Sequence, residues 1–406
     1  MRTELFVICL GLAASACSID TLAGDDAGGG GGGGGGDGWT AMPLLDDMSN
    51  PDRAVYHKGN DLVTGIYYES ADKGFIVSAG DGETFTRGGA VFTATGGEVS
   101  SVAFSGDGTG VSLNGSIDFV GLEKTPSGYL AMAYASDVIA SKDGGATFTI
   151  EKNGPGFGIE PVMAFAVTGT GTTLVRKTGV VTVGTGAPGP STSYTDIWAP
   201  NAIPTIPDPV PATMCQGGPR GAGVPTTHDS VYVAPDRNFI AYTSNPGTYE
   251  PQICISTDGG HSFTPRVLTV PEAAEDLPPT GVTFASAMVG ITWFASPTFG
   301  TYIKRTTDGG TTWTDVALPA EVAPHGLELP GGFFAADGQH GWLAGYDHDD
   351  SAALLLATAD GGATWQVVPG VGTAASAAGG DKLYTVFALD ADHVWVGGAR
   401  GLVMHN

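Results

Sequence analysis

Positive charge is scarce in this sequence. Lysine and arginine number 17 against 42 aspartate and glutamate residues, which gives a formal net charge of −25. Nucleic-acid binding requires a basic surface, and electrostatic attachment to anionic lipid requires one as well. The charge balance therefore argues against both, and a solvated acidic surface explains most of it. A basic partner remains open.

Long apolar and helical stretches are missing too. The apolar run Leu5–Leu12 is too short to span a bilayer as a helix, and no long stretch shows helical periodicity. Glycine and proline are abundant instead, at 65 and 26 residues, and only 15% of the residues are charged. This composition suits many short strands joined by tight turns. We therefore expect an all-β fold.

The first 17 residues have the order of an export signal. Arg2 supplies a positive charge, Leu5–Leu12 an apolar core, and Ala14-Ser15-Ala16 a small-residue cleavage site. Cys17 follows directly, and the arrangement resembles the lipobox of bacterial lipoproteins, whose cysteine becomes the lipid-modified first residue. Ala14 stands where leucine is commoner, so plain cleavage after Ala16 stays open. Residues 1–17 are interpreted as a lipoprotein signal peptide that ends at a lipidated Cys17.

Residues 18–38 are predicted to be a flexible tether. They contain an unbroken glycine run from Gly28 to Gly36, which has no side chains to bury and is costly in entropy to order. As a flexible coil the segment would reach roughly 25 Å. Ser18, directly after Cys17, resembles the signal that sends lipoproteins to the outer membrane. The predicted location is a lipid anchor in the outer membrane, with the periplasmic and cell-surface sides both open.

Four stretches share the pattern Ser/Thr-x-Asp-Gly-Gly-x-Ser/Thr-aromatic, and we call them the repeated turns. Their first hydroxyl, acid, second glycine, second hydroxyl and aromatic residues are, in chain order, Ser141, Asp143, Gly145, Thr147 and Phe148; Ser256, Asp258, Gly260, Ser262 and Phe263; Thr306, Asp308, Gly310, Thr312 and Trp313; and Thr358, Asp360, Gly362, Thr364 and Trp365. A weaker copy runs from Ser78 to Phe85, with its acid one place later at Asp81.

The repeated turns have the chemistry of tight hairpins. A Gly-Gly pair suits a turn with positive φ angles, and the Asp and Ser/Thr oxygens can accept hydrogen bonds from the turn's own amides. The closing aromatic carries a large apolar area into the core. A metal or catalytic role for the acids is the alternative, but an EF-hand loop requires alternating acids and a distal Glu. We interpret these residues as structural.

These copies resemble the Asp-box, or bacterial neuraminidase repeat, of sialidases, sortilin-type receptors and the photosystem II assembly-factor family. The stretch Gly341–Gly345 (GWLAG), followed by Thr358–Trp365 (TADGGATW), is more similar to the photosystem II assembly-factor type than to sialidases. All of these proteins are β-propellers, so the resemblance implies one propeller over residues 39–406. It lies at the level of repeats and implies no particular activity.

The closing aromatics indicate the number of blades. They stand at Trp39, Phe85, Phe148, Trp198, Phe263, Trp313 and Trp365, although the copy at Trp198 (STSYTDIW) lacks the glycines. Seven four-stranded blades are predicted, with six or eight left open. The chain stops after three strand-like runs at 383–389, 393–397 and 401–405. The N-terminal strand, residues 39–43, is therefore predicted to complete the C-terminal blade and close the ring.

A Pro-rich insert at about 199–228 interrupts the repeats. Such a loop is either a binding element or a spacer strapped along a blade. It contains Cys215, and Cys254 lies in the strand-like run before Ser256. Because Cys9 leaves with the signal and Cys17 goes to lipid, Cys215 and Cys254 remain as a pair in an oxidising compartment. We predict that they form a disulfide.

Few residues suggest a cofactor or a catalytic centre. Asp347-His348-Asp349-Asp350 could ligate Ca²⁺ through carboxylates, and no other cofactor is expected. His340 and His393 precede Trp342 and Trp395 at matching positions, which indicates structural repeat residues. The sequence contains neither a zinc pattern nor a serine nucleophile elbow.

The resemblance admits two functions. A sialidase-like glycoside hydrolase would need three arginines around the substrate carboxylate, a Tyr nucleophile assisted by Glu, and an Asp acid/base. None of the arginines after the signal has the Arg-Ile-Pro setting that usually opens a sialidase domain: Arg53, Arg87, Arg176, Arg220, Arg237, Arg266, Arg305 and Arg400. We favour a monomeric, membrane-tethered extracytoplasmic propeller that binds an envelope protein or a glycan without catalysis. The hydrolase is the alternative.

Overall fold

The computed structural model describes the chain in segments. These are residues 38–42, 62–79, 90–95, 98–105, 119–125, 128–133, 138–141, 143–146, 149–151, 162–168, 171–176, 180–185, 193–198, 215, 230–244, 251–271 and 277–406. The predicted signal peptide, the tether up to residue 37 and all of the insert except Cys215 lie outside them.

The described strands form seven antiparallel sheets of four strands each. The first three sheets are β2 (Leu62–Ser70), β3 (Lys73–Ala79), β4 (Ala90–Thr95) and β5 (Glu98–Ser105); β6 (Phe119–Thr125), β7 (Gly128–Ala133), β8 (Val138–Ser141) and β9 (Thr149–Glu151); and β10 (Val162–Thr168), β11 (Gly171–Arg176), β12 (Val181–Thr185) and β13 (Ser193–Trp198). The next three are β14 (Val231–Val233), β15 (Ile240–Ser244), β16 (Gln252–Ser256) and β17 (Thr264–Val267); β18 (Gly281–Phe284), β19 (Gly290–Ser296), β20 (Gly300–Thr306) and β21 (Thr314–Val316); and β22 (Leu327–Phe334), β23 (Gly341–Asp347), β24 (Ala352–Thr358) and β25 (Gln366–Val367). The last consists of β26 (Leu383–Ala388), β27 (Val394–Gly398), β28 (Val403–His405) and β1 (Thr40–Ala41).

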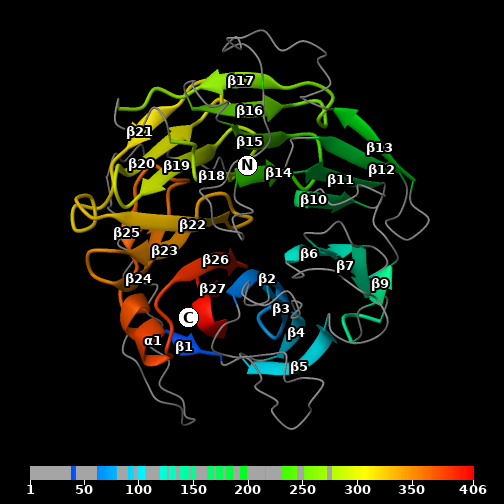
Figure 1. The fold of residues 1–406 in the computed structure, drawn as a ribbon, viewed down its shortest axis with the longest axis horizontal. Helices are drawn as coiled ribbons and strands as arrows, with labels where there is room; N and C mark the ends of the chain where they lie inside the picture. Colours follow the sequence, from blue (N-terminus) through cyan, green and yellow to red (C-terminus); the bar gives the residue numbers. More distant parts are fainter. Residues whose placement is uncertain are drawn as a thin grey trace, which may run out of the picture.

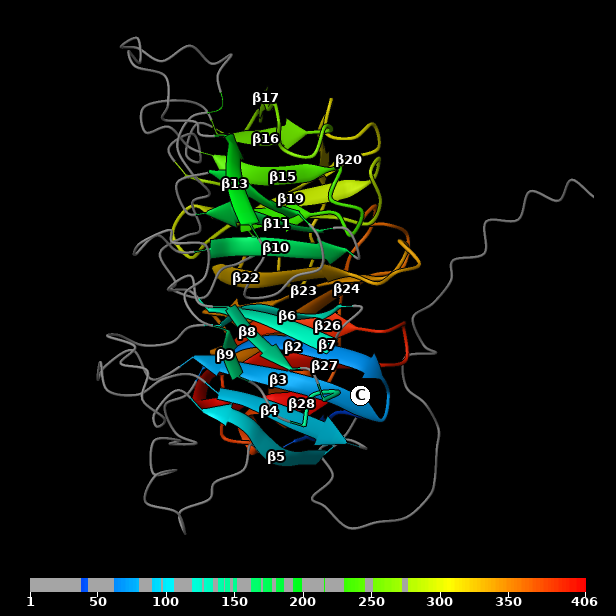
Figure 2. The same ribbon diagram turned by 90° about the vertical axis from the view of Figure 1, so that its right-hand side faces the viewer.

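The sheets stand around a common axis with the first strand of each nearest the centre, except that β26 is innermost in the sheet that contains β1 (Figure 1). Each inner strand packs against the inner strand of the next sheet, and β26 packs against β2. From the side, the strands run from one face of the disc to the other (Figure 2). The predicted all-β propeller is confirmed.

The core lies between neighbouring sheets. Strands covered on both faces read as near-continuous apolar runs, such as AALLLAT in β24, and not as alternating ones. Trp293 of β19 is fully buried, and its indole N–H donates to the Leu329 carbonyl of the next sheet at 2.7 Å. This packing holds each sheet against its neighbours and so fixes the loops at the two faces.

The first described strand joins the last three. Thr40 of β1 lies opposite His405 of β28 and Ala41 opposite Met404, and the Met42 N–H donates to the Val403 carbonyl at 2.8 Å. Trp39 is buried directly before this strand. The pairing falls within the predicted strand 39–43 but is shorter, because only Thr40 and Ala41 have ladder partners.

Two helices join strands near the C-terminus of the described chain. α1 (Val371–Ala377) leads from β25 to β26 and packs against β24, and the 3₁₀-helix η6 (Ala399–Gly401) joins β27 to β28. Nothing in the sequence predicted α1, because its residues VGTAASA are too few and too small to form an amphipathic pattern. No helix in the described part of the chain has the length and hydropathy to cross a bilayer.

Two of the predicted turn copies are at the wrong position. The weaker copy Ser78–Phe85 begins at the end of β3, the second strand of its sheet, whereas the repeated turns follow the third strand. Trp198 is the last residue of β13, whereas Trp313 and Trp365 come immediately before the fourth strands β21 and β25. Trp198 is therefore not a closing aromatic, because strand order defines that position, and Asp81 and Phe85 lie outside the described residues.

Candidate functional site

The repeated turns all lie at one face of the propeller. They connect β8 to β9, β16 to β17, β20 to β21 and β24 to β25. Both glycines of each turn have positive φ angles, between 66° and 92°. Only glycine adopts these angles without strain, so the predicted hairpin geometry is confirmed. Thr147 and Phe148 lie outside the described residues.

We call this end of the disc the turn face. It carries the repeated turns and the turns between first and second strands. The opposite end, which we call the loop face, carries the turns between second and third strands and the segments that lead into β18, β22 and β26.

The acid of each repeated turn is held inside its own loop. Asp308 Oδ1 accepts the Thr306 hydroxyl at 2.8 Å and the Thr312 N–H at 2.9 Å, and Oδ2 accepts the Thr312 hydroxyl at 2.7 Å. Thr306 Oγ1 in turn accepts the Gly310 N–H at 2.8 Å. The turns at Asp258 and Asp360 repeat the whole set, and the described part of the Asp143 turn repeats its first half.

These hydrogen bonds keep the acids ionised. Burial opposes ionisation of Asp258, but hydrogen bonds from Ser262 and Ser256 outweigh it and lower the pKa to about 2. The Thr312 N–H and hydroxyl lower the pKa of Asp308 to about 2 in the same way. Burial also opposes ionisation of Asp360, and Thr364 lowers its pKa below the usual value. The acids therefore stabilise turns, which supports their structural interpretation.

Acid should weaken these turns in a defined window. A carboxyl whose pKa falls from 3.8 to about 2 on folding contributes stability above about pH 4 and loses that contribution between pH 4 and pH 2. Asp258→Asn should therefore destabilise the protein near neutral pH, and its deficit against the native chain should shrink as pH falls through this window. Urea unfolding at a series of pH values measures the deficit. Asp392→Asn, at an exposed turn position, is the control, and a deficit independent of pH would contradict the prediction.

The repeated turns also tie sheets together. A Cβ on Gly310 would collide with Ile255 Cδ1 of the preceding sheet, and one on Gly362 would lie 2.7 Å from Ile291 Cγ2. The Arg305 Nε–H donates to the Gly361 carbonyl of the next sheet at 2.7 Å. The turn face is thus built from groups that contact one another.

An apolar pocket of about 210 Å³ opens on the loop face between β18 and β22. Its wall includes Pro278, Phe294, Pro297 and Leu329, with Glu328 among the few polar groups. Phe299 lies two residues beyond Pro297 in the β19–β20 turn, and its side chain is 46% exposed. Ser296 Oγ holds this turn by accepting the Phe299 N–H at 3.3 Å. An exposed aromatic side chain beside an apolar pocket is typical of a protein-binding surface.

A charged cluster borders the pocket. Glu328 Oε2 accepts Lys382 Nζ at 3.1 Å and lies 3.4 Å from His348 Nε2. Lys382 Nζ also lies 4.7 Å from the centre of the Tyr346 ring. Partial burial of the ammonium lowers the pKa of Lys382, but the interaction with Glu328 outweighs this effect and raises the pKa above its usual value. Sequence analysis did not find this cluster, because its members come from β22, β23, the β23–β24 turn and the segment before β26 and share no motif.

Two of the three carboxylates in the predicted calcium-binding stretch Asp347-His348-Asp349-Asp350 lie close together, those of Asp347 and Asp349. Ligand atoms of His325, Asp347 and Asp349 lie within 4.8 Å of one another, and His325 was not predicted. Asp347 is only 3% exposed and is engaged already: His325 Nδ1 lies 2.6 Å from Oδ2, and Oδ1 accepts the Asp349 N–H at 2.9 Å. The hydrogen bond to Asp347 raises the pKa of His325.

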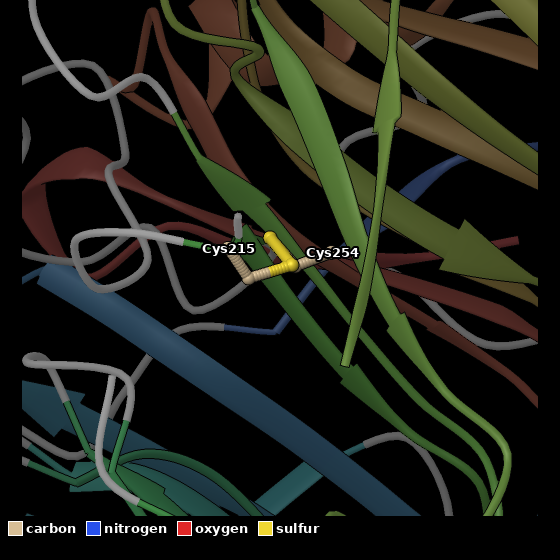
Figure 3. The surroundings of a disulfide bond; sticks show 2 residues. All are labelled: Cys215 and Cys254. Atoms are coloured by element: carbon tan, nitrogen blue, oxygen red, sulfur yellow. A yellow bond between two sulfur atoms is a disulfide. The ribbon is translucent and has the colours of Figure 1, made fainter. Parts of the chain in front are cut away.

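The predicted disulfide between Cys215 and Cys254 is confirmed (Figure 3). The two Cα atoms are 5.7 Å apart, and the residues are 39 positions apart in the chain. Cys254 is fully buried in β16 and Cys215 is 6% exposed, and both pack in one core cluster with Tyr242. The bond therefore attaches the one described residue of the insert to the sheet β14–β17.

The described arginines are distributed over the molecule. Arg237 and Arg305 lie near the turn face, and Arg176 and Arg400 near the loop face, each in a different sheet. Arg266 lies in β17, the outermost strand of the sheet whose β14–β15 turn contains Arg237. Arg176 NH2 forms an ion pair with Asp196 at 2.5 Å. Within the described residues, therefore, three arginines do not converge as the sialidase-like alternative requires. Arg53, Arg87 and Arg220 lie outside them.

The fold defines the chain as a β-propeller, and its structural neighbours are propellers too. No family model matches the sequence, and no curated protein matches it either. A structure of YCF48 bound to D1 peptide is 15% identical and has a TM-score of 0.59, covering 90% of this chain and 96% of that one. YCF48 from Cyanidioschyzon merolae is 14% identical with a TM-score of 0.59, covering 90% and 98%. The resemblance to the photosystem II assembly-factor type is thereby supported at the level of the fold.

Proposed function

We propose that this chain is a non-catalytic platform that binds a protein partner through its loop face. The observation that carries the proposal is the exposed Phe299 beside the apolar pocket and the charged cluster at Glu328. An apolar anchor rimmed by charged groups is how protein interfaces commonly combine affinity with orientation. The peptide held by YCF48, a neighbour in fold, is consistent with such a role.

Two matched variants test which face of the propeller binds the partner. Met288 is 54% exposed on the turn face, and Phe299 is 46% exposed on the loop face. Each lies in a turn in which a serine Oγ accepts its backbone N–H. Ser286 accepts that of Met288 at 3.2 Å, and Ser296 accepts that of Phe299 at 3.3 Å. Either side chain can change to aspartate without removing that bond. Phe299→Asp should reduce partner recovery by roughly tenfold or more, as loss of an interface anchor does, and Met288→Asp should leave it unchanged.

The measurement is cross-linking in intact cells, followed by purification of the chain and quantification of the recovered proteins. Equal recovery with both variants would contradict the choice of face. Failure of the native chain to recover any protein above a no-cross-linker control would contradict the platform itself, and binding on a glycan array in its place would assign a glycan as ligand.

We propose also that the seven sheets are the blades of one ring, which the N-terminal strand closes. The pairing of β1 with β28 and the packing of β26 against β2 support this. Closure by pairing of the two chain ends holds the first and last strands of a propeller together against opening.

The tether belongs to the same proposal. If Cys17 is the anchor, residues 18–38 would link the propeller to the outer membrane by a flexible coil with an end-to-end reach of roughly 25 Å. Cys17→Ala should therefore move the protein from the membrane fraction to the soluble fraction on cell fractionation, since the lipid is its attachment. Ser18→Ala is the control and should stay with the membrane. Unchanged membrane association of Cys17→Ala would contradict the anchor.

A further inference from the structure

The predicted tether joins the folded domain at a fixed point. Trp39, directly after the exposed Gly38, is only 6% exposed and packs with Trp342 and Leu402 in the core between the last two sheets. Met42, three residues further on, is fully buried. The chain is therefore held in the core directly where the tether ends, and the tether is attached to one fixed place on the disc.

That place lies at the turn face. β28 is the third strand of its sheet, so it runs from the loop face to the turn face and ends there at His405. The Asn406 N–H then donates at 3.2 Å to the carbonyl of Val394, the residue that follows the β26–β27 turn of the same face. Thr40 of β1 lies opposite His405 in an antiparallel pair. Gly38 therefore leads into β1 from the turn face, at the outer rim of the ring (Figure 1).

The thickness of the disc separates the tether from the pocket beside Phe299. A strand such as β24 has seven residues, which at roughly 3.3 Å per residue makes the disc about 23 Å thick. The predicted tether has almost the same reach, roughly 25 Å. With the turn face toward the membrane, the whole of that reach is available to the tether. With the loop face toward the membrane, the tether would first have to extend along the side of the disc, which leaves a flexible coil few conformations.

We propose that the anchored protein keeps its turn face toward the membrane and presents its loop face to the aqueous compartment. The surface at Phe299 then fits a partner that approaches from that compartment, whereas a segment lying on the same membrane would meet the turn face. The proposal deepens the platform function and rests on it and on the anchor at Cys17, since it states the side from which the partner comes.

Resonance energy transfer to the membrane measures the orientation. The full lipidated chain is placed in phosphatidylcholine vesicles whose headgroups carry an acceptor dye. These lipids have no net charge, so the −25 charge of the chain favours neither face. A donor dye is attached to one introduced cysteine, Met288→Cys on the turn face or Phe299→Cys on the loop face, while Cys215 and Cys254 stay bonded to each other. Both positions belong to the sheet β18–β21, so a tilt of the disc moves both together.

The Met288→Cys donor should transfer more energy than the Phe299→Cys donor, because it would lie closer to the headgroups by about the 23 Å thickness of the disc. Each label in the Cys17→Ala background, mixed with the same vesicles, sets the baseline for a chain without the anchor. Equal transfer from the two labels of the anchored chain, or more from Phe299→Cys, would overturn the orientation.

The length of the tether provides a second test. Deleting residues 28–36 leaves 12 of its 21 residues and shortens its reach to roughly 19 Å, so the difference in transfer should grow. Inserting a second glycine run of the same length extends the reach to roughly 30 Å, so the difference should shrink. A difference that does not change with length would mean that something other than the tether orients the disc, and the proposal would fall.

The orientation, the anchor and the platform can fail separately. A native chain that does not bind the vesicles would refute the anchor and the orientation with it, and the platform would still be decided by the Phe299→Asp experiment in cells. If the labels report the expected orientation but cells yield no protein partner, the orientation stands and the platform falls. Recovery of a partner should not change when residues 28–36 are deleted. If that deletion lowers recovery as Phe299→Asp does, the partner lies on the same membrane and the approach from the aqueous side is overturned.

Discussion

Replacing Cys215 and Cys254 together with alanine should lower the free energy of unfolding by about 4 kcal/mol. The disulfide joins residues 39 positions apart, and a cross-link over that distance removes a large part of the conformational entropy of the unfolded chain. The loss should appear as a lower midpoint of urea unfolding, with a steeper dependence on denaturant than in the cross-linked chain because the uncross-linked unfolded state exposes more surface.

The alanine changes also remove two buried sulfur atoms, so the cross-link needs its own control. Both cysteines pack in the cluster that contains Tyr242, where a small cavity is costly as well. Unfolding the native chain in the presence of a reductant separates the two effects. Reductant should lower the native midpoint most of the way to that of the double variant and should leave the variant unmoved. A native chain indifferent to reductant, or peptide mapping that recovers Cys215 and Cys254 as unlinked thiols, would contradict the prediction.

The parts of the fold that sequence analysis predicted correctly are those fixed by local chemistry. A Gly-Gly pair preceded by an Asp and set between two apolar runs favours a turn with positive φ angles, so Gly309 and Gly310 identified their hairpin from local sequence alone. Trp39 was assigned from its likeness to Trp313 and Trp365, and like them it comes immediately before the fourth strand of its sheet. The disulfide followed from counting cysteines.

The parts that were missed depend on strand order and on contacts between distant residues. Trp198 has neighbours in the sequence like those of a closing aromatic, yet it lies at the end of β13. The Glu328 cluster joins Glu328 to Lys382, 54 positions away, through the packing of β22 beside β26. No motif marks such a cluster, because its members are brought together only when the sheets pack.

The acids that stood out in the sequence, such as Asp308, bind their own turns. Exposed residues such as Phe299 and Asp350 stand in turns with no repeated pattern. In this propeller the repeats build the scaffold, and the partner binding that we propose falls on the irregular loops of the opposite face.

Because the repeats build the scaffold, changing one of their glycines should have a large effect. Gly310→Ala should destabilise the protein by about 3 kcal/mol. Backbone strain at positive φ accounts for roughly 1 kcal/mol of this, and overpacking for a further 1–3 kcal/mol or so. Gly310 has a φ of 81°, and a Cβ there would collide with Ile255 Cδ1 of the preceding sheet. Gly379→Ala is the matched control, because Gly379 has a φ of 83° and open space where its Cβ would lie. Gly379→Ala should lower the free energy of unfolding by the strain component alone.

A double-mutant cycle tests the collision itself. Ile255→Val removes Cδ1, so the combination Gly310→Ala/Ile255→Val should be more stable than the sum of the two single losses by at least about 1 kcal/mol, whereas Gly379→Ala/Ile255→Val should be additive. Urea unfolding of the five variants and the native chain measures both couplings. Additivity at Gly310 would mean that the turn relaxes away from Ile255, and that the second glycine serves only the backbone of its own turn. Coupling would mean that each repeated turn fits closely against the sheet before it, which explains why glycine is needed at a position where backbone strain alone would cost little.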